Sequence, residues 1–264
     1  MPRWILIVAA VAVVLYIAFC GILFAFQRSL IYYPQPDAGP RSVDTLTLAL
    51  DGAQVLVNTS PHDGPDAVIY FGGNAEEVWR SLPDLKATFP ERALYLLNYR
   101  GYCGSTGKPS EAALVADALA LFDRVHAEHP RVSVIGRSLG SAVAVHVASL
   151  RPIERLALIT PFNSLEEIAA RQFPFVPLHW LLLDKFESWR YAPTVTAPTR
   201  VLAAQHDEVI PRSSTESLVA HFPRGLATLT IVEGTGHNTI SESPEFIALL
   251  RGALGTAPAR NSEP

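Results

Sequence analysis

The chain has 264 residues and a formal net charge of −4, and no stretch of it is rich in basic residues. This balance argues against nucleic-acid binding, which needs a basic surface. Hydrophobic residues make up 49% of the chain. Its length suits one domain of about 230 residues with a sizeable core beside an apolar N-terminal segment. The two cysteines, Cys20 and Cys103, are not expected to form a disulfide, because Cys20 lies within that apolar segment.

The start of the chain predicts a membrane span. The stretch from Trp4 to Phe26 contains no charged residue, and as a helix it would be about 35 Å long, enough to cross a bilayer with some tilt. Trp4 at one end and Tyr32-Tyr33 beyond the other are typical of interfacial aromatic belts. We therefore expect residues 1–27 to form a single transmembrane anchor.

Three other interpretations of this segment fit less well. A cleaved signal peptide has a shorter apolar region and a small-x-small exit, which is missing here. A lipoprotein signal needs a small residue before its cysteine, whereas Cys20 follows Phe19. A buried core helix is not expected to be apolar on all faces at a chain end. Arg3 nearly balances Arg28 and Arg41, but such a short tail usually stays in the cytoplasm, which predicts an extracytoplasmic domain.

Downstream, strand-like and helix-like segments alternate, which predicts an α/β domain with a mostly parallel sheet flanked by helices. Eight strands are expected, as an N-terminal hairpin near 46–50 and 55–58 followed by strands near 67–71, 93–98, 132–136, 155–160, 199–204 and 227–232. Helices are expected near 75–88, 110–128, 139–149, 212–221 and 243–253. Residues 28–254 would form this domain, and residues 255–264 a disordered tail.

The five residues from Gly136 to Gly140 carry the strongest chemical signal. They follow an apolar run that ends at Ile135 and precede a helix-like segment rich in small residues. Gly-x-Ser-x-Gly at such a turn is typical of a nucleophile elbow. Ser138 would take strained φ/ψ at the tip, and the two glycines remove side chains that would collide. A glycine-rich turn with an N-cap serine is the alternative, since chance alone supplies this pattern, so other residues must support it.

A serine nucleophile needs a general base and a carboxylate that orients the base. In sheets of this type they follow the serine in the order acid, then histidine, each on a loop after a later strand. Asp207 and His237 follow the last two predicted strands in that order. The sequence therefore predicts a triad of Ser138, Asp207 and His237.

Alternatives to these assignments remain. Asp207 could cap the helix that begins near Pro211, and Glu208 and Glu233 are rival candidates for the acid. The other histidines lie in helical or loop segments, and none has metal-ligand spacing, so no metal site is predicted.

Acyl transfer also requires two N–H groups that stabilise the oxyanion. The first would be that of Leu139, directly after the nucleophile. The second is expected in the turn after the strand at 67–71, where glycines allow close approach of the backbone. We assign it to Asn74, with Gly73 as the alternative.

With these residues in place, the chain from about Phe26 to Leu254 resembles the α/β-hydrolase superfamily, and within it the membrane-anchored branch related to serine-aminopeptidase-type and monoacylglycerol-lipase-like hydrolases. The matching segments are Phe71–Ala75 at the oxyanion turn, Asn98–Gly107 after the fourth strand, Thr160–Leu165 after the sixth, Asp207–Pro211 at the acid loop and Gly236-His237 at the histidine loop. The resemblance implies this fold and this catalytic machinery but not a particular substrate.

Two positions depart from the family pattern. Gly72 stands where the family has a histidine, which would loosen the oxyanion turn or widen the acyl site. Cys103 replaces a usual glycine and is expected to be a small buried residue.

Residues 162–198 are too long for a plain connection between strands, and they are rich in aromatic and aliphatic residues among prolines. At this place the family builds a lid or acyl-pocket cap; a pair of core helices over the sheet is the alternative. The apolar character favours an apolar or acyl substrate.

Together these features predict a serine hydrolase at a membrane, acting on a small or lipid-like carboxylic ester without a cofactor or metal. Peptidase, thioesterase and acyltransferase activities are enzymatic alternatives on the same triad. A catalytically silent, membrane-anchored binding module is the alternative from another class.

Overall fold

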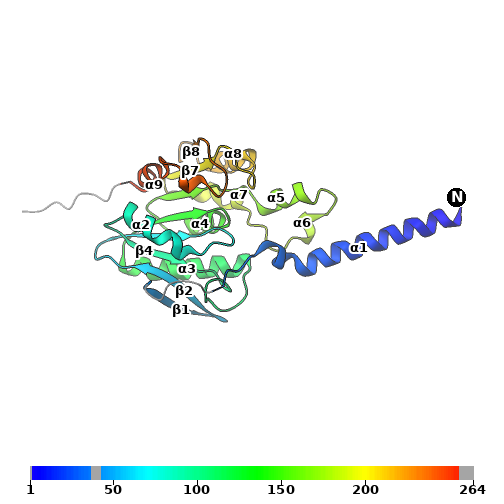
Figure 1. The fold of residues 1–264 in the computed structure, drawn as a ribbon, viewed down its shortest axis with the longest axis horizontal. Helices are drawn as coiled ribbons and strands as arrows, with labels where there is room; N and C mark the ends of the chain where they lie inside the picture. Colours follow the sequence, from blue (N-terminus) through cyan, green and yellow to red (C-terminus); the bar gives the residue numbers. More distant parts are fainter. Residues whose placement is uncertain (1, 37–42, 256–264) are drawn as a thin grey trace, which may run out of the picture.

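The computed structural model describes residues 2–36 and 43–255, and these form one eight-stranded sheet in the order β1-β2-β4-β3-β5-β6-β7-β8 (Figure 1). The strands are β1 (Thr45–Leu50), β2 (Ala53–Ser60), β3 (Asp66–Phe71), β4 (Ala93–Leu97), β5 (Arg131–Arg137), β6 (Leu156–Ile159), β7 (Thr199–Ala204) and β8 (Ala227–Val232). The pairs β1–β2 and β2–β4 are antiparallel and all later pairs are parallel. The predicted sheet is therefore confirmed. Arg41 and residues 256–264 of the predicted tail lie outside the described ranges.

Helices cover both faces of the sheet. One layer contains α3 (Glu111–Glu128), α4 (Leu139–Leu150) and α8 (Arg212–His221); the other contains α2 (Leu82–Thr88) and α9 (Phe246–Leu254). Successive side chains of β3 point to opposite faces of the sheet. Ile69 and Phe71 pack in the core beneath α3, α4 and α8, and Val68 and Tyr70 pack in the core beneath α2 and α9. The carboxyl ends of the parallel strands then share one edge, where α/β proteins place their functional loops.

The helix predicted at 75–88 is wrong in its first half. After β3 the chain turns back on itself, forms a 3₁₀ turn η1 (Val78–Ser81) and only then enters α2 at Leu82. Ala75 has a φ of 58°, a left-handed conformation that an α-helix excludes. The helix predicted at 243–253 begins later, at Phe246, after a 3₁₀ turn η3 (Ile240–Glu242).

The N-terminal helix α1 (Arg3–Ile31) is unbroken and projects from one side of the domain (Figure 1). Its mean hydropathy reaches 3.0, and it is long and apolar enough to cross a membrane. It continues past residue 27, where the sequence places the end of the anchor. Only Cys20 and Gln27 of its residues are buried in the described part of the chain.

The segment 162–198 divides into two parts. It contains α5 (Leu165–Gln172), α6 (Leu178–Leu181), α7 (Ser188–Tyr191) and the 3₁₀ turn η2 (Ala192–Thr194). Its second part is core, with Phe186 and Val195 buried against the sheet layer. Its first part, residues 165–183, which we call the outer lid, is exposed at Phe175 and Trp180 and lies beside α1 (Figure 1).

Candidate active site

Ser138 occupies the tight turn between β5 and α4. Its φ is 48° and its ψ is −116°, a strained backbone for a residue with a side chain. A hydrogen bond to the neighbouring strand β6 holds this turn, because the Ser138 N–H donates to the Ile159 carbonyl at 2.9 Å. The side chain is only partly covered, so the hydroxyl is accessible. The sequence-based expectation of a strand, a strained serine and a helix agrees with this geometry.

The two glycines beside the serine are sterically required. A Cβ at Gly136 would lie 2.5 Å from the Gly140 carbonyl oxygen and 2.6 Å from the Ala144 Cβ. A Cβ at Gly140 would overlap the carbonyl oxygen of Phe71 and lie 2.5 Å from that of Gly72. The nucleophile turn therefore packs directly on the turn after β3, and any larger side chain would separate them.

Asp207, His237 and Ser138 lie in one hydrogen-bonded line. His237 Nε2 is 3.0 Å from Ser138 Oγ, and its Nδ1 is 2.9 Å and 3.0 Å from the two Asp207 carboxylate oxygens. Because the carboxylate only accepts, Nδ1 carries the proton and Nε2 is free to accept from the serine hydroxyl. The side chains of His237 and Asp207 are each 7% exposed, so the pair is shielded from water.

The loop that carries Asp207 distinguishes it from the two other candidate acids, Glu208 and Glu233. Asp207 Oδ1 accepts from the backbone N–H groups of Val209 and Ile210, so the carboxylate holds its own turn as well as the histidine. Glu208 instead accepts from the backbone N–H of His237 at 3.0 Å. That bond and the backbone N–H of Glu208 itself lower the pKa of Glu208. Glu233 is exposed, and of the three acids only Asp207 meets the imidazole.

The turn after β3 presents its backbone to Ser138. A Cβ at Gly73 would be 3.5 Å from Ser138 Cβ. Gly73 is the weaker candidate donor, because its N–H already donates to Glu76 Oε2 at 2.6 Å. Within the described residues, the N–H groups of Asn74 and Leu139 donate no hydrogen bond. The predicted oxyanion pair, Asn74 and Leu139, therefore has two free donors beside the nucleophile.

Glu76 is a site residue that sequence reasoning missed. Its carboxylate accepts from Gly73 N–H, from the Tyr70 hydroxyl at 2.6 Å and from the Ser81 hydroxyl at 3.1 Å. It also pairs with Arg137 of the nucleophile turn at 3.4 Å. An acidic residue in a loop gives no sequence signal of this kind, because its partners lie on other elements.

The two departures from the family pattern have local explanations. A Cβ at Gly72 would lie 2.5 Å from the Val78 side chain, and the Gly72 carbonyl accepts from the Tyr99 hydroxyl at 2.9 Å. The turn is closely packed around Gly72, with no room for a larger side chain unless Val78 moves. Cys103 is buried, as predicted, and its φ is 46°, a conformation that favours glycine. No group of three or more side chains suited to a metal ion occurs among the described residues.

Comparison with known proteins is consistent with this geometry. Residues 55–200 match the model of the Alpha/beta hydrolase family. The uncharacterized protein Rv2307c of Mycobacterium tuberculosis is 34% identical over 86% of this chain and 87% of its own length. The lysophosphatidylserine lipase ABHD12 of Xenopus tropicalis is 30% identical over 60% of this chain and 48% of its own.

Among solved structures, the esterase Pf2001 of Pyrococcus furiosus has a TM-score of 0.68 at 16% identity, over 85% of this chain and all of its own. At that identity the likeness concerns the fold alone. The family match, by contrast, covers more than half of the chain and includes the nucleophile turn. The chain belongs to the alpha/beta hydrolase family.

Proposed function

We propose that the chain is a serine hydrolase that cleaves carboxylic esters, with Ser138 as nucleophile, His237 as general base and Asp207 as the residue that orients His237. The observation that carries the proposal is the hydrogen-bonded line from Asp207 through His237 to Ser138 at a strained turn. Strain at one residue persists only where the surrounding structure holds it, and such residues concentrate at active sites.

In the proposed reaction, Ser138 Oγ attacks the ester carbonyl carbon while His237 Nε2 takes the hydroxyl proton. The N–H groups of Leu139 and Asn74 stabilise the resulting oxyanion. Collapse of this intermediate breaks the ester C–O bond, and the leaving alcohol takes the proton from His237. Water then attacks the acyl-enzyme, with His237 again accepting a proton, and releases the carboxylic acid and free Ser138.

The character of the substrate is supported by two observations. The outer lid and the neighbouring part of α1 are apolar, which suits an acyl chain better than a charged group. A relative at 30% identity carries the name lysophosphatidylserine lipase. We therefore favour esters of lipid origin, with amides, thioesters and acyl transfer as alternatives that use the same triad.

We also propose that α1 anchors the protein in a membrane and that residues 28–254 form the catalytic domain on the extracytoplasmic side. The 29 residues of α1 span about 44 Å, more than the hydrocarbon core of a bilayer. Fusion of a reporter to each terminus, read in intact cells, tests this orientation.

A fluorophosphonate probe tests the chemistry. We expect labelling of the folded wild-type protein and none of Ser138→Ala. The matched control is Ser149→Ala, which removes a hydroxyl from the same helix that donates only to the His146 carbonyl, and it should label like wild type. Folded wild-type protein that stays unlabelled would refute the hydrolase and favour a binding module.

A further inference from the structure

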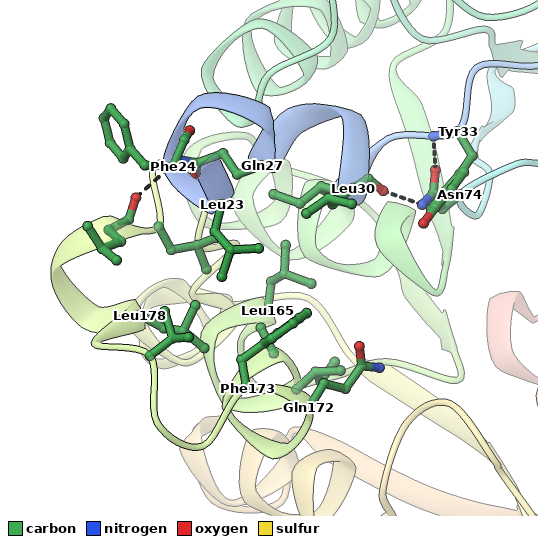
Figure 2. Close-up of a pocket in the computed structure, with 16 residues that line it drawn as sticks. Leu23, Phe24, Gln27, Leu30, Tyr33, Asn74, Leu165, Gln172, Phe173 and Leu178 are labelled. Carbon is green, nitrogen blue, oxygen red and sulfur yellow. Dashed lines mark hydrogen bonds between the residues drawn. The ribbon is translucent and has the colours of Figure 1, made fainter. Parts of the chain in front are cut away.

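A cavity of about 300 Å³ lies between α1 and the outer lid. Leu23, Gln27 and Leu30 line it from α1, and Leu165, Phe173 and Leu178 line it from the lid. Figure 2 shows Leu23 and Leu30 facing the leucine and phenylalanine side chains of the opposite wall. Its volume is at the lower end of the range for small-molecule sites. It has room for one narrow apolar group.

A stripe along α1 runs through the lining residues Leu23, Gln27 and Ile31 and continues past the cavity. Tyr16, Cys20, Leu23, Gln27 and Ile31 follow one another at intervals of three or four residues, which places them on one face. Cys20 and Gln27 on this stripe are the buried residues of the helix. The remainder of α1 is largely exposed in the described chain. One face of the predicted membrane helix is thus already occupied by protein.

Gln27 fastens the lid to this stripe. Its amide donates to the Leu181 carbonyl at 3.1 Å, and its side-chain oxygen accepts from the Leu183 N–H at 2.7 Å. Next to it, Arg28 pairs with Asp184 at 2.9 Å. A buried polar side chain needs such partners. The lid and α1 therefore form one unit at this level.

Beyond the residues that line the cavity, α1 and the lid are joined again at the level of the apolar run. The Tyr16 hydroxyl donates to the Phe175 carbonyl at 2.7 Å, and Tyr16 lies eleven positions before Gln27, about 16 Å along the helix. Phe175 and Trp180 of the lid are 86% and 82% exposed. Large apolar side chains beside a membrane helix suit contact with lipid. The bond to Tyr16 satisfies a lid carbonyl that hydrocarbon would leave without a partner.

The inner end of the cavity reaches the oxyanion turn. Asn74 lines it, and its side chain donates to the Ile31 carbonyl and accepts from the Tyr33 N–H (Figure 2). The end of α1 is thus tied to the residue that supplies the proposed second oxyanion donor. Gly73, next in the turn, borders Ser138. Ser138 itself lies just beyond the lining of the cavity.

We propose that this cavity is the acyl-chain site and that the membrane helix α1 is one of its walls. The substrate class is an ester with a single long acyl chain, taken directly from the bilayer. The chain enters between α1 and the lid at the level of Phe175 and Trp180, while the ester group reaches Ser138 past Asn74. This inference rests on the proposed function.

Cross-linking tests the site without requiring catalysis. The full-length Ser138→Ala protein is placed in phosphatidylcholine vesicles that contain a monoacylglycerol with a diazirine at the end of a palmitoyl chain. We expect cross-links in residues 16–31 and 165–182. Leu23→Trp, which fills the groove, should lower this labelling about tenfold. The control Ile22→Trp adds the same side chain on the lipid-exposed face and should not.

Hydrolysis by the otherwise unchanged protein gives a second readout. Leu23→Trp should lower turnover of dodecanoyl aryl esters about tenfold more than that of butyryl esters, whereas Ile22→Trp should keep the wild-type ratio. Cross-links that spread over all faces of α1, or an unchanged chain-length ratio in Leu23→Trp, would overturn the acyl site. Groove labelling by the lipid without fluorophosphonate labelling of wild type would instead refute the hydrolase and keep the site.

Discussion

Glu76 connects the oxyanion turn with the nucleophile turn, and its removal should slow the reaction without removing any triad residue. One carboxylate oxygen accepts from the Gly73 N–H and faces Arg137, and the other accepts from the hydroxyls of Tyr70 and Ser81. The side chains of Glu76 and Arg137 are 11% and 20% exposed. Burial opposes the charge on Arg137, but Glu76 and Tyr70 outweigh it, so the pKa of Arg137 lies above its ordinary value.

The size of the effect follows from these contacts. A hydrogen bond to a charged group contributes about 1.5–3 kcal/mol, and Glu76→Ala removes the one that fixes Gly73, next to the proposed donor Asn74. A displacement of about 1 Å at a reacting centre lowers the rate about 10²-fold. We therefore expect Glu76→Ala to lower kcat about 10²-fold with little change in KM, because the acyl chain binds elsewhere.

Glu76→Gln should recover most of this loss. Gly73 and Arg137 can only donate, so the glutamine oxygen would face them, and its NH₂ would face the hydroxyls of Tyr70 and Ser81, which can accept. We expect kcat within about tenfold of wild type for this variant, since the bond to Gly73 is kept and only the charge is lost.

The assay compares fluorophosphonate labelling rates and ester turnover with thermal unfolding of the same samples. Glu77→Ala is the matched control, because Glu77 lies one residue further on and its carboxylate, among the described residues, pairs with Arg80; the two side chains are 17% and 64% exposed. Such exposed pairs contribute about 1 kcal/mol or less. If folded Glu76→Ala protein reacts as fast as Glu77→Ala, the connection does not set the rate and the reasoning is refuted.

Two further predictions concern acidic residues. Asp207→Asn should lower kcat about 10⁴-fold, because it disturbs the tautomer of the triad histidine. Glu208→Gln keeps an oxygen that accepts from the backbone N–H of His237, so its kcat should stay within about tenfold of wild type. Steady-state kinetics measure both variants, and the opposite order would exclude Asp207 as the acid. Burial raises the pKa of Glu111, against hydrogen bonds from the backbone N–H groups of Lys185 and Phe186, and the Asp184 carboxylate raises it further. A raised folded-state pKa gives stability that is present below the unfolded pKa and is lost as pH rises through the folded pKa. Glu111→Gln should therefore match wild type near about pH 4 and melt higher than wild type near about pH 8; a Tm difference that does not grow with pH would contradict this.

The strands were predictable because their signal is local. Buried parallel strands require short, continuous apolar runs, and residues 132–135 and 199–204 are such runs between polar turns. The order of Ser138, Asp207 and His237 follows from the order of the strands that they follow, so this order was also predictable from the sequence. Ser138 directly follows β5, and Asp207 and His237 lie on the loops after β7 and β8.

The turn after β3 was not predictable in the same way. Residues 75–88 have a helical composition, but Glu76 turns back to accept from Gly73 and Tyr70. Those bonds hold Ala75 in a left-handed conformation and delay the helix to Leu82. Glu76 also pairs with Arg137 of the nucleophile turn, 61 positions away. Local propensity is overridden by specific side-chain contacts of this kind, of which composition gives no sign.

Gln27 shows the same limit in α1. At the end of an apolar run, a glutamine indicates only that the span is over. In the structure it joins the lid through residues 154 and 156 positions away. Neither its burial nor its partners follow from the helical period of α1, because the other residues of its stripe are a tyrosine, a cysteine, a leucine and an isoleucine, which form no clear polar pattern.

These contacts also bear on the choice between an anchor and a cleaved signal sequence. A signal peptide leaves the mature protein, so its residues need no specific partners in the folded domain. In α1, Tyr16 and Gln27 bond to the lid, and the Ile31 carbonyl accepts from Asn74 at the oxyanion turn. Cleavage after Tyr16 would remove its bond to the lid, and cleavage after Gln27 would also remove the Gln27 bonds and open one side of the cavity. The contacts therefore favour a helix that stays with the domain as both anchor and wall.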